Sequence, residues 1–241
     1  MTPRSRPPRG LFITLEGTEG CGKSTQAKLL GEHLRNQGYD TVETREPGGT
    51  PLAEKIRSLL LDRADEPVAP ETEAFLVLAA RRQHVAQVIE PALARGSIVL
   101  CDRFIDSTLA YQGYARGLDI ATLERLNRLA THALMPDLTL VFDLPVSTGL
   151  ARRRSAAELN RLDRESLRFH RSVRTGFLDL AKRHPARIKV LSARASKEAV
   201  ARAVARVVTP MLGHIRRGVD HNRPAASRPS PQKSQARHAI R

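Results

Sequence analysis

The chain has 241 residues, of which 41% are hydrophobic, and its formal net charge is +15. This length suits one large domain or a domain with tails, and the apolar share is enough for a core, which excludes a wholly disordered protein. A charge of this size indicates an anionic partner or a basic appendage. Two cysteines imply no disulfide framework, and no apolar run is long enough to cross a membrane, so we expect a cytoplasmic protein.

Part of the positive charge lies in two segments that lack apolar periodicity. Residues 1–9, "MTPRSRPPR", have no apolar centre of the kind found in a signal peptide. Residues 213–241 carry seven basic residues against the single acid Asp220. Such segments bury too little apolar surface to become ordered. We therefore predict disordered basic tails at 1–9 and 213–241, on either side of a folded domain at 10–212.

Between the tails, short apolar runs alternate with stretches of helical spacing. The runs predict strands at 11–16, 41–45, 97–102, 138–144 and 188–192. Helical spacing occurs at 24–35, 51–61, 71–95, 120–133, 146–154, 161–183 and 196–212. This alternation predicts an α/β fold in which a parallel sheet has helices on both faces and binds ligands at the carboxyl ends of its strands.

The first strand leads into the stretch "EGTEGCGKST", residues Glu16 to Thr25. Its spacing fits G-x-x-x-x-G-K-[ST], a P-loop whose backbone N–H groups surround phosphate oxygens. Glycine allows the backbone to approach the phosphate closely. In this motif the lysine reaches the terminal phosphates and the hydroxyl holds Mg²⁺. We predict that the nucleotide is bound by Gly17, Thr18, Glu19, Gly20, Cys21, Gly22, Lys23, Ser24 and Thr25.

Charged residues follow the second and third predicted strands, at the same rim as the P-loop. Asp102 ends the third strand, where an acid beside a P-loop holds Mg²⁺, so Ser24 and Asp102 are the predicted metal ligands; a helix N-cap is the alternative role of Asp102. Arg103 suits bidentate phosphate binding, with a surface salt bridge as its alternative. Arg45, Arg81 and Arg103 supply a second anion site, which favours a phosphotransferase over an ATPase.

Arginines are concentrated in "GLARRRSAAELNRLDR", residues 149–164, between two predicted helices. A solvated charged face is the ordinary explanation of such a run. In phosphoryl transfer, however, arginines that close over the transferred group stabilise its charge, and a lid excludes water. We predict an arginine-rich lid at about 152–163.

Cys21 and Cys101 are interpreted as small buried residues, with a redox switch as the alternative.

These motifs resemble those of the bacterial thymidylate kinases, which are ATP-dependent dTMP kinases. The resemblance rests on "EGTEGCGKST", "TREPGGTPLAEKIRSLLL", "LAARRQHV", "IEPALARGSIVLCDRFIDSTLAYQG" and "RLDRES", and it covers most of the chain from 11 to about 212. It implies the P-loop nucleoside monophosphate kinase fold with a five-stranded parallel sheet. It also implies a homodimer that uses Mg²⁺ and transfers the γ-phosphoryl group of ATP to dTMP, giving dTDP.

The resemblance also implies roles for single residues. Arg45 and Arg103 would hold the phosphate of dTMP, and Glu19 would meet its 3′-hydroxyl. Arg81 would hydrogen-bond the edge of thymine. The base and sugar pocket would be lined by Val77, Thr108, Tyr111 and Gln112, with Tyr111 occupying the space of a ribose 2′-hydroxyl. The expected catalytic residues are Lys23, Arg103, Arg154 and Arg161, with Arg152 and Arg153 as further candidates in the lid.

The chain departs from the family pattern at several positions. Val77 stands where a phenylalanine usually stacks on thymine, and loss of that stacking would cost on the order of 1 kcal/mol. Phe75, two residues away on the helix, points in a different direction and is not expected to compensate. Phe104 replaces a Tyr or His. The lid has Ala156 and Ala157 in place of Arg-Gly, and Asn160 in place of Asp. Gly20 stands where some members have an arginine, which indicates a lid-supplied arginine.

Two other functions stay open at this stage. The change at Val77 suits a nucleoside monophosphate kinase with altered base choice. The basic C-terminal tail suits a non-catalytic nucleotide-binding module that contacts nucleic acid or another polyanion, and such binding would depend strongly on salt. The tail has no aromatic residues on which bases could stack, so a solubilising extension is the simpler interpretation of it.

Overall fold

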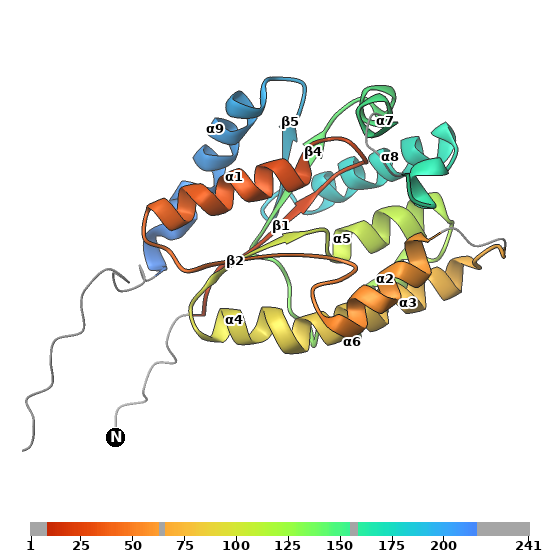
Figure 1. Ribbon diagram of the computed structural model, residues 1–241, viewed down its shortest axis with the longest axis horizontal. Helices are drawn as coiled ribbons and strands as arrows, with labels where there is room; N and C mark the ends of the chain where they lie inside the picture. The colour runs from red at the N-terminus through yellow and green to blue at the C-terminus, as the bar shows by residue number, and fades with distance from the viewer. Residues whose placement is uncertain (1–8, 63–65, 155–158, 216–241) are drawn as a thin grey trace, which may run out of the picture.

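The computed structural model describes residues 9–62, 66–154 and 159–215, apart from the side chains of Arg154 and His214. Its centre is a five-stranded parallel sheet in the order β2-β3-β1-β4-β5 (Figure 1). The strands are β1 Phe12–Glu16, β2 Thr41–Arg45, β3 Ile98–Asp102, β4 Leu138–Asp143 and β5 Ile188–Ser192. The predicted strands and their parallel arrangement are confirmed, with boundaries that differ by at most one residue.

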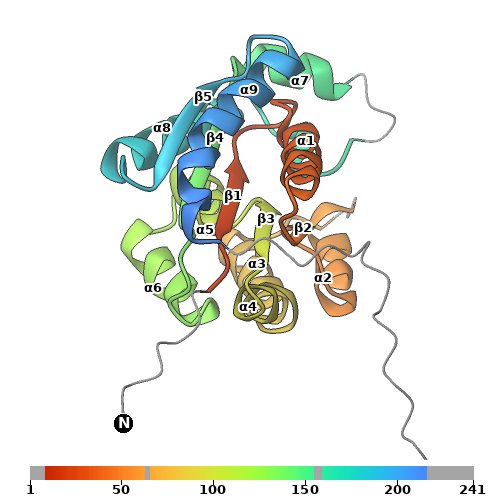
Figure 2. The same ribbon diagram turned by 90° about the vertical axis from the view of Figure 1, so that its left-hand side faces the viewer.

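One face of the sheet is covered by α1 (Lys23–Asn36) and α9 (Lys197–Val208) (Figure 2). Each helix buries a stripe with helical spacing: Leu30 and Leu34 in α1, and Val200 and Val204 in α9. Ile13 and other alternate residues of β1 point into the same cluster. The pattern of apolar residues thus explains why these two helices share this face.

The opposite face is covered by a longer series of helices. α3 (Pro70–His84) continues through a π-helical turn η1 (Val85–Ile89) into α4 (Glu90–Ala94), and α8 (Leu167–Arg183) packs beside β4 and β5. α2 (Pro51–Leu61) packs on α3, and α6 (Ile120–Ala130) also packs on α3. At the carboxyl end of the sheet, α7 (Val146–Arg154) follows β4, and the 3-10 turn η3 (Leu162–Arg164) precedes α8.

The segment after β3 is helical although no helix was predicted there. It forms α5 (Ile105–Thr108) and the π-helical segment η2 (Leu109–Ala115). All residues from 105 to 113 are buried, polar and apolar alike, so the segment has no solvent-exposed face and its sequence shows no helical period. Gly113 lies so close to Ile120 that an added Cβ would stand 2.2 Å from the Ile120 Cδ1 atom. Burial on all sides therefore hid this helix from the sequence pattern.

The packed chain extends slightly past both predicted domain ends. After α9, the 3-10 segment η4 (Thr209–His214) leads to Ile215, which belongs to the same buried cluster as Leu212. At the other end, Arg9 pairs with Asp137. The rest of the predicted tails, residues 1–8 and 216–241, lies outside the described part of the chain. No helix among the described residues is long and apolar enough to span a membrane.

Candidate active site

The P-loop connects β1 to α1. Gly22 caps α1 in a left-handed conformation with φ 94°, which a glycine adopts without strain. The first N–H groups of the helix are left for a ligand, and the helix dipole makes this end favourable for anions. Lys23 Nζ donates to the carbonyls of Gly17 and Thr18, both at 3.0 Å. The loop therefore holds its lysine at the position where the helix begins.

The loop also packs against α7 through two glycines. A Cβ on Gly20 would lie 2.0 Å from the carbonyl oxygen of Gly149, and a Cβ on Gly149 would lie 2.3 Å from the carbonyl oxygen of Glu19. Neither position has room for a side chain unless the backbone moves. The glycine at position 20, which indicated a lid-supplied arginine, is thus required by backbone packing.

Ser24 and Asp102 lie side by side, as the metal-site prediction requires. The Ser24 hydroxyl donates to Asp102 Oδ2 at 2.5 Å, which joins the start of α1 to the end of β3. A hydroxyl and a carboxylate are oxygen donors of the kind that Mg²⁺ prefers. Both line the same cleft as Lys23, so this pair fits a cation that accompanies phosphate groups.

Arg103 follows Asp102 and has a left-handed backbone with φ 73°. A non-glycine residue there costs on the order of 1–3 kcal/mol and persists only where its surroundings fix it. Its Nη2 donates to Glu19 Oε1 at 2.9 Å, and its guanidinium lies 4.9 Å from the centre of the Tyr111 ring. The Tyr111 hydroxyl also donates to Glu19, at 2.7 Å. The three side chains thus hold one another in place.

The Glu19 carboxylate stays charged in this arrangement. Burial opposes ionisation, but Arg103, His170 and Lys23 outweigh it and lower the pKa of Glu19. His170 of α8 is fully buried, and its Nδ1 lies 3.5 Å from Glu19 Oε2. A charged carboxylate of the P-loop therefore stands beside Arg103.

Arg81 of α3 is almost fully buried at 1% exposure. Its Nε donates to Glu46 at 2.7 Å, and its Nη1 donates to Thr108 at 2.7 Å and to Asn127 at 2.6 Å. Its guanidinium also stacks on Phe104 at 5.2 Å. These contacts fix its orientation, and among the described residues its Nη2 has no partner.

Glu46, His84 and Cys101 gather behind Arg81 and resemble a metal cluster in composition. Two of these side chains already have protein partners. His84 forms hydrogen bonds with both Glu46 and Thr44, and Glu46 forms a salt bridge with Arg81. Burial, followed by nearby Glu46, raises the pKa of the Cys101 thiol well above its usual value. Cys21 is likewise buried and free. The interpretation of both cysteines as small buried residues fits these surroundings.

The residues above line a single cleft of roughly 370 Å³, within the size range of small-molecule sites. All the residues predicted to bind the second substrate line it: Glu19, Arg45, Val77, Arg81, Arg103, Thr108, Tyr111 and Gln112. Lys23, Ser24 and Asp102 complete its donor side. Phe75 is 60% exposed and does not line the cleft.

The structure separates the arginines of the predicted lid. Arg153 lines the cleft, with its Nε 3.0 Å from Asp163, whereas Arg161 donates to the Leu60 carbonyl at 2.9 Å and to Glu73 at 2.6 Å, away from the cleft lining. Arg154 is the last residue of α7, and its side chain and residues 155–158 lie outside the described part of the chain.

Sequence reasoning missed Arg57, which also lines the cleft and donates to the Pro47 carbonyl at 2.9 Å. Burial, and then the neighbouring Arg45, lowers its pKa. The sequence contained one signal for Arg57. It lies in "TREPGGTPLAEKIRSLLL", in the helix that directly follows the turn after β2.

Comparisons with known proteins agree with this geometry. The sequence model described as "Thymidylate kinase" matches residues 15–204. The chain belongs to the thymidylate kinase family. The family transfers a phosphoryl group from ATP to dTMP, and the resemblance seen in the sequence is confirmed.

Named relatives of the thymidylate kinase family match nearly all of the domain. The thymidylate kinase of Pseudomonas putida strain W619 is 53% identical over 206 residues, which cover 86% of this chain and 100% of the relative. That of Thermomicrobium roseum is 55% identical over 207 residues, 86% of this chain and 98% of the relative. A crystal structure of thymidylate kinase from Ehrlichia chaffeensis aligns with a TM-score of 0.69 and 37% identity, over 84% of this chain and 99% of that one.

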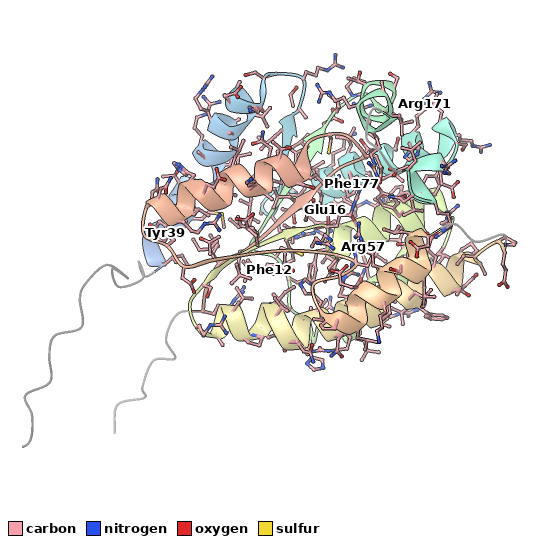
Figure 3. All side chains as sticks on the ribbon, viewed as in Figure 1. Phe12, Glu16, Tyr39, Arg57, Arg171 and Phe177 are labelled. Atoms are coloured by element: carbon pink, nitrogen blue, oxygen red, sulfur yellow. The ribbon has the colours of Figure 1, made fainter. Side chains whose placement is uncertain are left out.

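One further carboxylate is buried at the end of β1 and does not line the cleft. Glu16 ends β1 and is fully buried in the interior of the molecule (Figure 3). It accepts hydrogen bonds from the Phe104 N–H at 2.7 Å, the Ser107 N–H at 3.2 Å and the Ser107 hydroxyl at 2.6 Å. Burial, and then nearby Asp106, raises the pKa of Glu16 from 4.5 to about 7, although these hydrogen bonds and Arg103 oppose the shift.

The raised pKa of Glu16 predicts a decrease in stability with increasing pH. Between pH 4.5 and about 7 the folded chain keeps a proton that the unfolded chain has released, so this group's stabilisation is lost as pH rises. Relative to Glu16→Gln, the wild-type free energy of unfolding should decrease by about 2 kcal/mol between pH 5 and pH 8. Urea unfolding of both proteins at several pH values measures the difference, and parallel pH curves would contradict the prediction.

Proposed function

We propose that this cleft carries the dTMP kinase reaction of the family, with ATP held by the P-loop and dTMP held by Arg103 and its neighbours. One observation carries the proposal. The Gly17 carbonyl receives hydrogen bonds from both Lys23 Nζ at 3.0 Å and Arg103 Nη1 at 3.2 Å. A phosphate bound by the lysine and a phosphate bound by the arginine therefore become neighbours, as direct phosphoryl transfer requires.

On the donor side, Lys23 and the N–H groups at the start of α1 bind the β- and γ-phosphates of ATP. Ser24 and Asp102 hold Mg²⁺, which neutralises charge on the phosphates when it is bound. The hydrogen bond between the two side chains supports this assignment, because it places both oxygens at one point of the cleft wall.

On the acceptor side, Arg45 and Arg103 hold the 5′-phosphate of dTMP. Glu19 and Tyr111 stand beside Arg103 and face the sugar, which supports a role in choosing deoxyribose. The Arg81 Nη2 is available to a carbonyl oxygen of thymine, since Glu46 holds the Nε and Thr108 and Asn127 hold the Nη1. The remaining wall of the base pocket is formed by Val77, Thr108 and Gln112.

Arg153 is the lid arginine that the structure favours for the transferred phosphoryl group, because it lines the cleft and its partner Asp163 is nearly fully buried. Arg154 stays a candidate from the sequence. Arg161 is held by Glu73 and the Leu60 carbonyl, which suits a role in fixing the lid to α2 and α3. An arginine placed on the transferring group adds charge stabilisation that can be worth orders of magnitude in rate.

A coupled assay of ADP release tests the function, with Mg·ATP and dTMP, dUMP, dCMP, dGMP or GMP as acceptor. The fastest turnover is expected with dTMP. Faster turnover with GMP or dGMP would favour altered base choice. ATP binding without release of ADP by any acceptor would favour a non-catalytic module and overturn the proposal.

The lid assignment predicts different effects for two arginines. Arg153→Ala should lower kcat at least 10-fold with little change in the KM for dTMP, because its charge acts mainly on the transition state. Arg161→Ala is the matched control. It should lower the Tm, and at a temperature where the variant stays folded its kcat should decrease less than that of Arg153→Ala. Equal losses of kcat in both variants would contradict the assignment.

Val77→Phe should tighten dTMP binding several-fold, because an aromatic ring on this wall can stack on thymine. Isothermal titration with dTMP measures the change. Phe75→Ala, at an exposed position of the same helix, serves as the control and should leave the Kd for dTMP unchanged. Weaker dTMP binding in Val77→Phe would show that the pocket has no space for the ring.

A second copy of the chain is the proposed partner for the apolar side chains exposed on three helices. These are Leu52 and Leu59 of α2, Phe75 of α3 and Leu129 of α6, each more than half exposed, and α2 and α6 both pack on α3. Leu129→Glu should convert a dimer into a monomer in sedimentation experiments, whereas Val190→Glu on β5 should leave the dimer intact.

The cytoplasm is the proposed location, in agreement with two free, buried cysteines.

A further inference from the structure

Glu16 takes no part in the reaction proposed above and does not line the cleft. Its carboxylate nevertheless has three donors, all from the turn that follows Arg103. Two are the N–H groups of Phe104 and Ser107, so Glu16 fixes the backbone at the start of α5. The third is the Ser107 hydroxyl, at 2.6 Å.

Ser107 connects this buried carboxylate to the cleft. Its hydroxyl donates to Glu16 and accepts from Arg103 Nη1 at 3.2 Å, and the residue itself lines the cleft. Arg103 has the unusual positive φ of 73°, and Phe104 next to it is extended, with φ −156°. The turn that aims Arg103 into the cleft is thus held at its backbone and at its side chain by the same carboxylate.

We propose that Glu16 is a positioning residue for the acceptor phosphate, which it serves by fixing Arg103 through Phe104 and Ser107. This inference rests on the proposed role of Arg103 in binding the phosphate of dTMP. It assigns to the buried end of β1 a part in substrate affinity, although Glu16 touches neither substrate.

The electrostatic surroundings argue against a role in stability alone. Asp106 is a second buried carboxylate close to Glu16, and it is itself paired with Arg187 at 2.6 Å. Ionisation of Glu16 beside it costs folding free energy, and a neutral side chain would avoid that cost. Residues that cost stability are retained where activity depends on them. The strained backbone at Arg103 supports the same conclusion, because such strain concentrates at functional sites.

Four variants of the full chain test the proposal by equilibrium binding at pH 8. Glu16→Gln and Ser107→Ala should each raise the Kd for dTMP about 3- to 10-fold, the loss of a hydrogen bond. Their Kd for ATP should change by less than about twofold. Both substitutions interrupt the same chain of hydrogen bonds, from Glu16 through the Ser107 hydroxyl to Arg103. The Kd of the double variant for dTMP should therefore be little higher than that of whichever single variant binds dTMP more weakly. Thr14→Val, on the same face of β1, removes a buried hydrogen bond to Thr139 and should leave both affinities unchanged.

Two comparisons separate positioning from other effects. Removal of a buried negative charge near Arg103 would by itself tighten binding of an anion, so tighter dTMP binding by Glu16→Gln would overturn the proposal. Thymidine has no phosphate, and its affinity should be the same in the wild type and in all four variants. An equal loss for thymidine and dTMP would indicate general damage to the pocket and also overturn it.

The wild-type result distinguishes the two levels of inference. If the wild-type chain binds ATP but not dTMP, the proposed function fails, and the positioning role fails with it. If the wild-type chain binds dTMP and phosphorylates it while Glu16→Gln and Ser107→Ala bind it normally, the function stands and the positioning role alone is wrong.

Discussion

The parallel pairing of β1 with β3 sets the geometry on which the cleft depends. Leu15 pairs with Asp102, and the Arg103 N–H donates to the Leu15 carbonyl at 3.0 Å. The two strands therefore end level with each other, and the P-loop and the turn at Arg103 leave the sheet side by side. Parallel strands bring their carboxyl ends to one rim, so the P-loop and the turn at Arg103 meet although they lie in distant parts of the chain.

Carboxylates accompany the cleft arginines, and the value of each pair depends on burial. Arg81 and Glu46 are at most 2% exposed, so their pairing neutralises two charges that have almost no contact with water and fixes the orientation of Arg81 at the cleft wall. Arg103 and Glu19 are partly exposed, and a bound phosphate can share this arginine without leaving an isolated charge. Arg45 and Glu54 are about half exposed, and that pair contributes little to stability. The three pairs thus range from one that is buried and fixed to one that is about half exposed.

The sequence predicted the sheet well because its strands are short apolar runs separated by strong helical patterns. It also predicted most of the cleft, since the P-loop and the turns after β2 and β3 have distinctive residues. The helix at 105–115 escaped detection because burial on every side removes the period on which such a prediction rests. Its side chains, Tyr111 and Gln112 among them, were found only through the family resemblance.

The lid shows a different limit of sequence reasoning. Arg153 and Arg161 have the same chemistry and lie eight positions apart, and nothing local says which of them faces the cleft. Their partners decide this: Asp163 holds Arg153 at the cleft wall, and Glu73, from a helix some ninety positions earlier in the chain, holds Arg161 outside it. Long-range ion pairs of this kind leave no trace in spacing or composition.

The backbone contact between Gly20 and Gly149 restricts how such an enzyme can change by mutation. An arginine at position 20 needs more than one substitution, because the α7 backbone occupies the volume of its Cβ and would have to shift at the same time. Two small residues without side-chain chemistry thus close position 20 of the P-loop to a charged side chain for as long as α7 keeps its place.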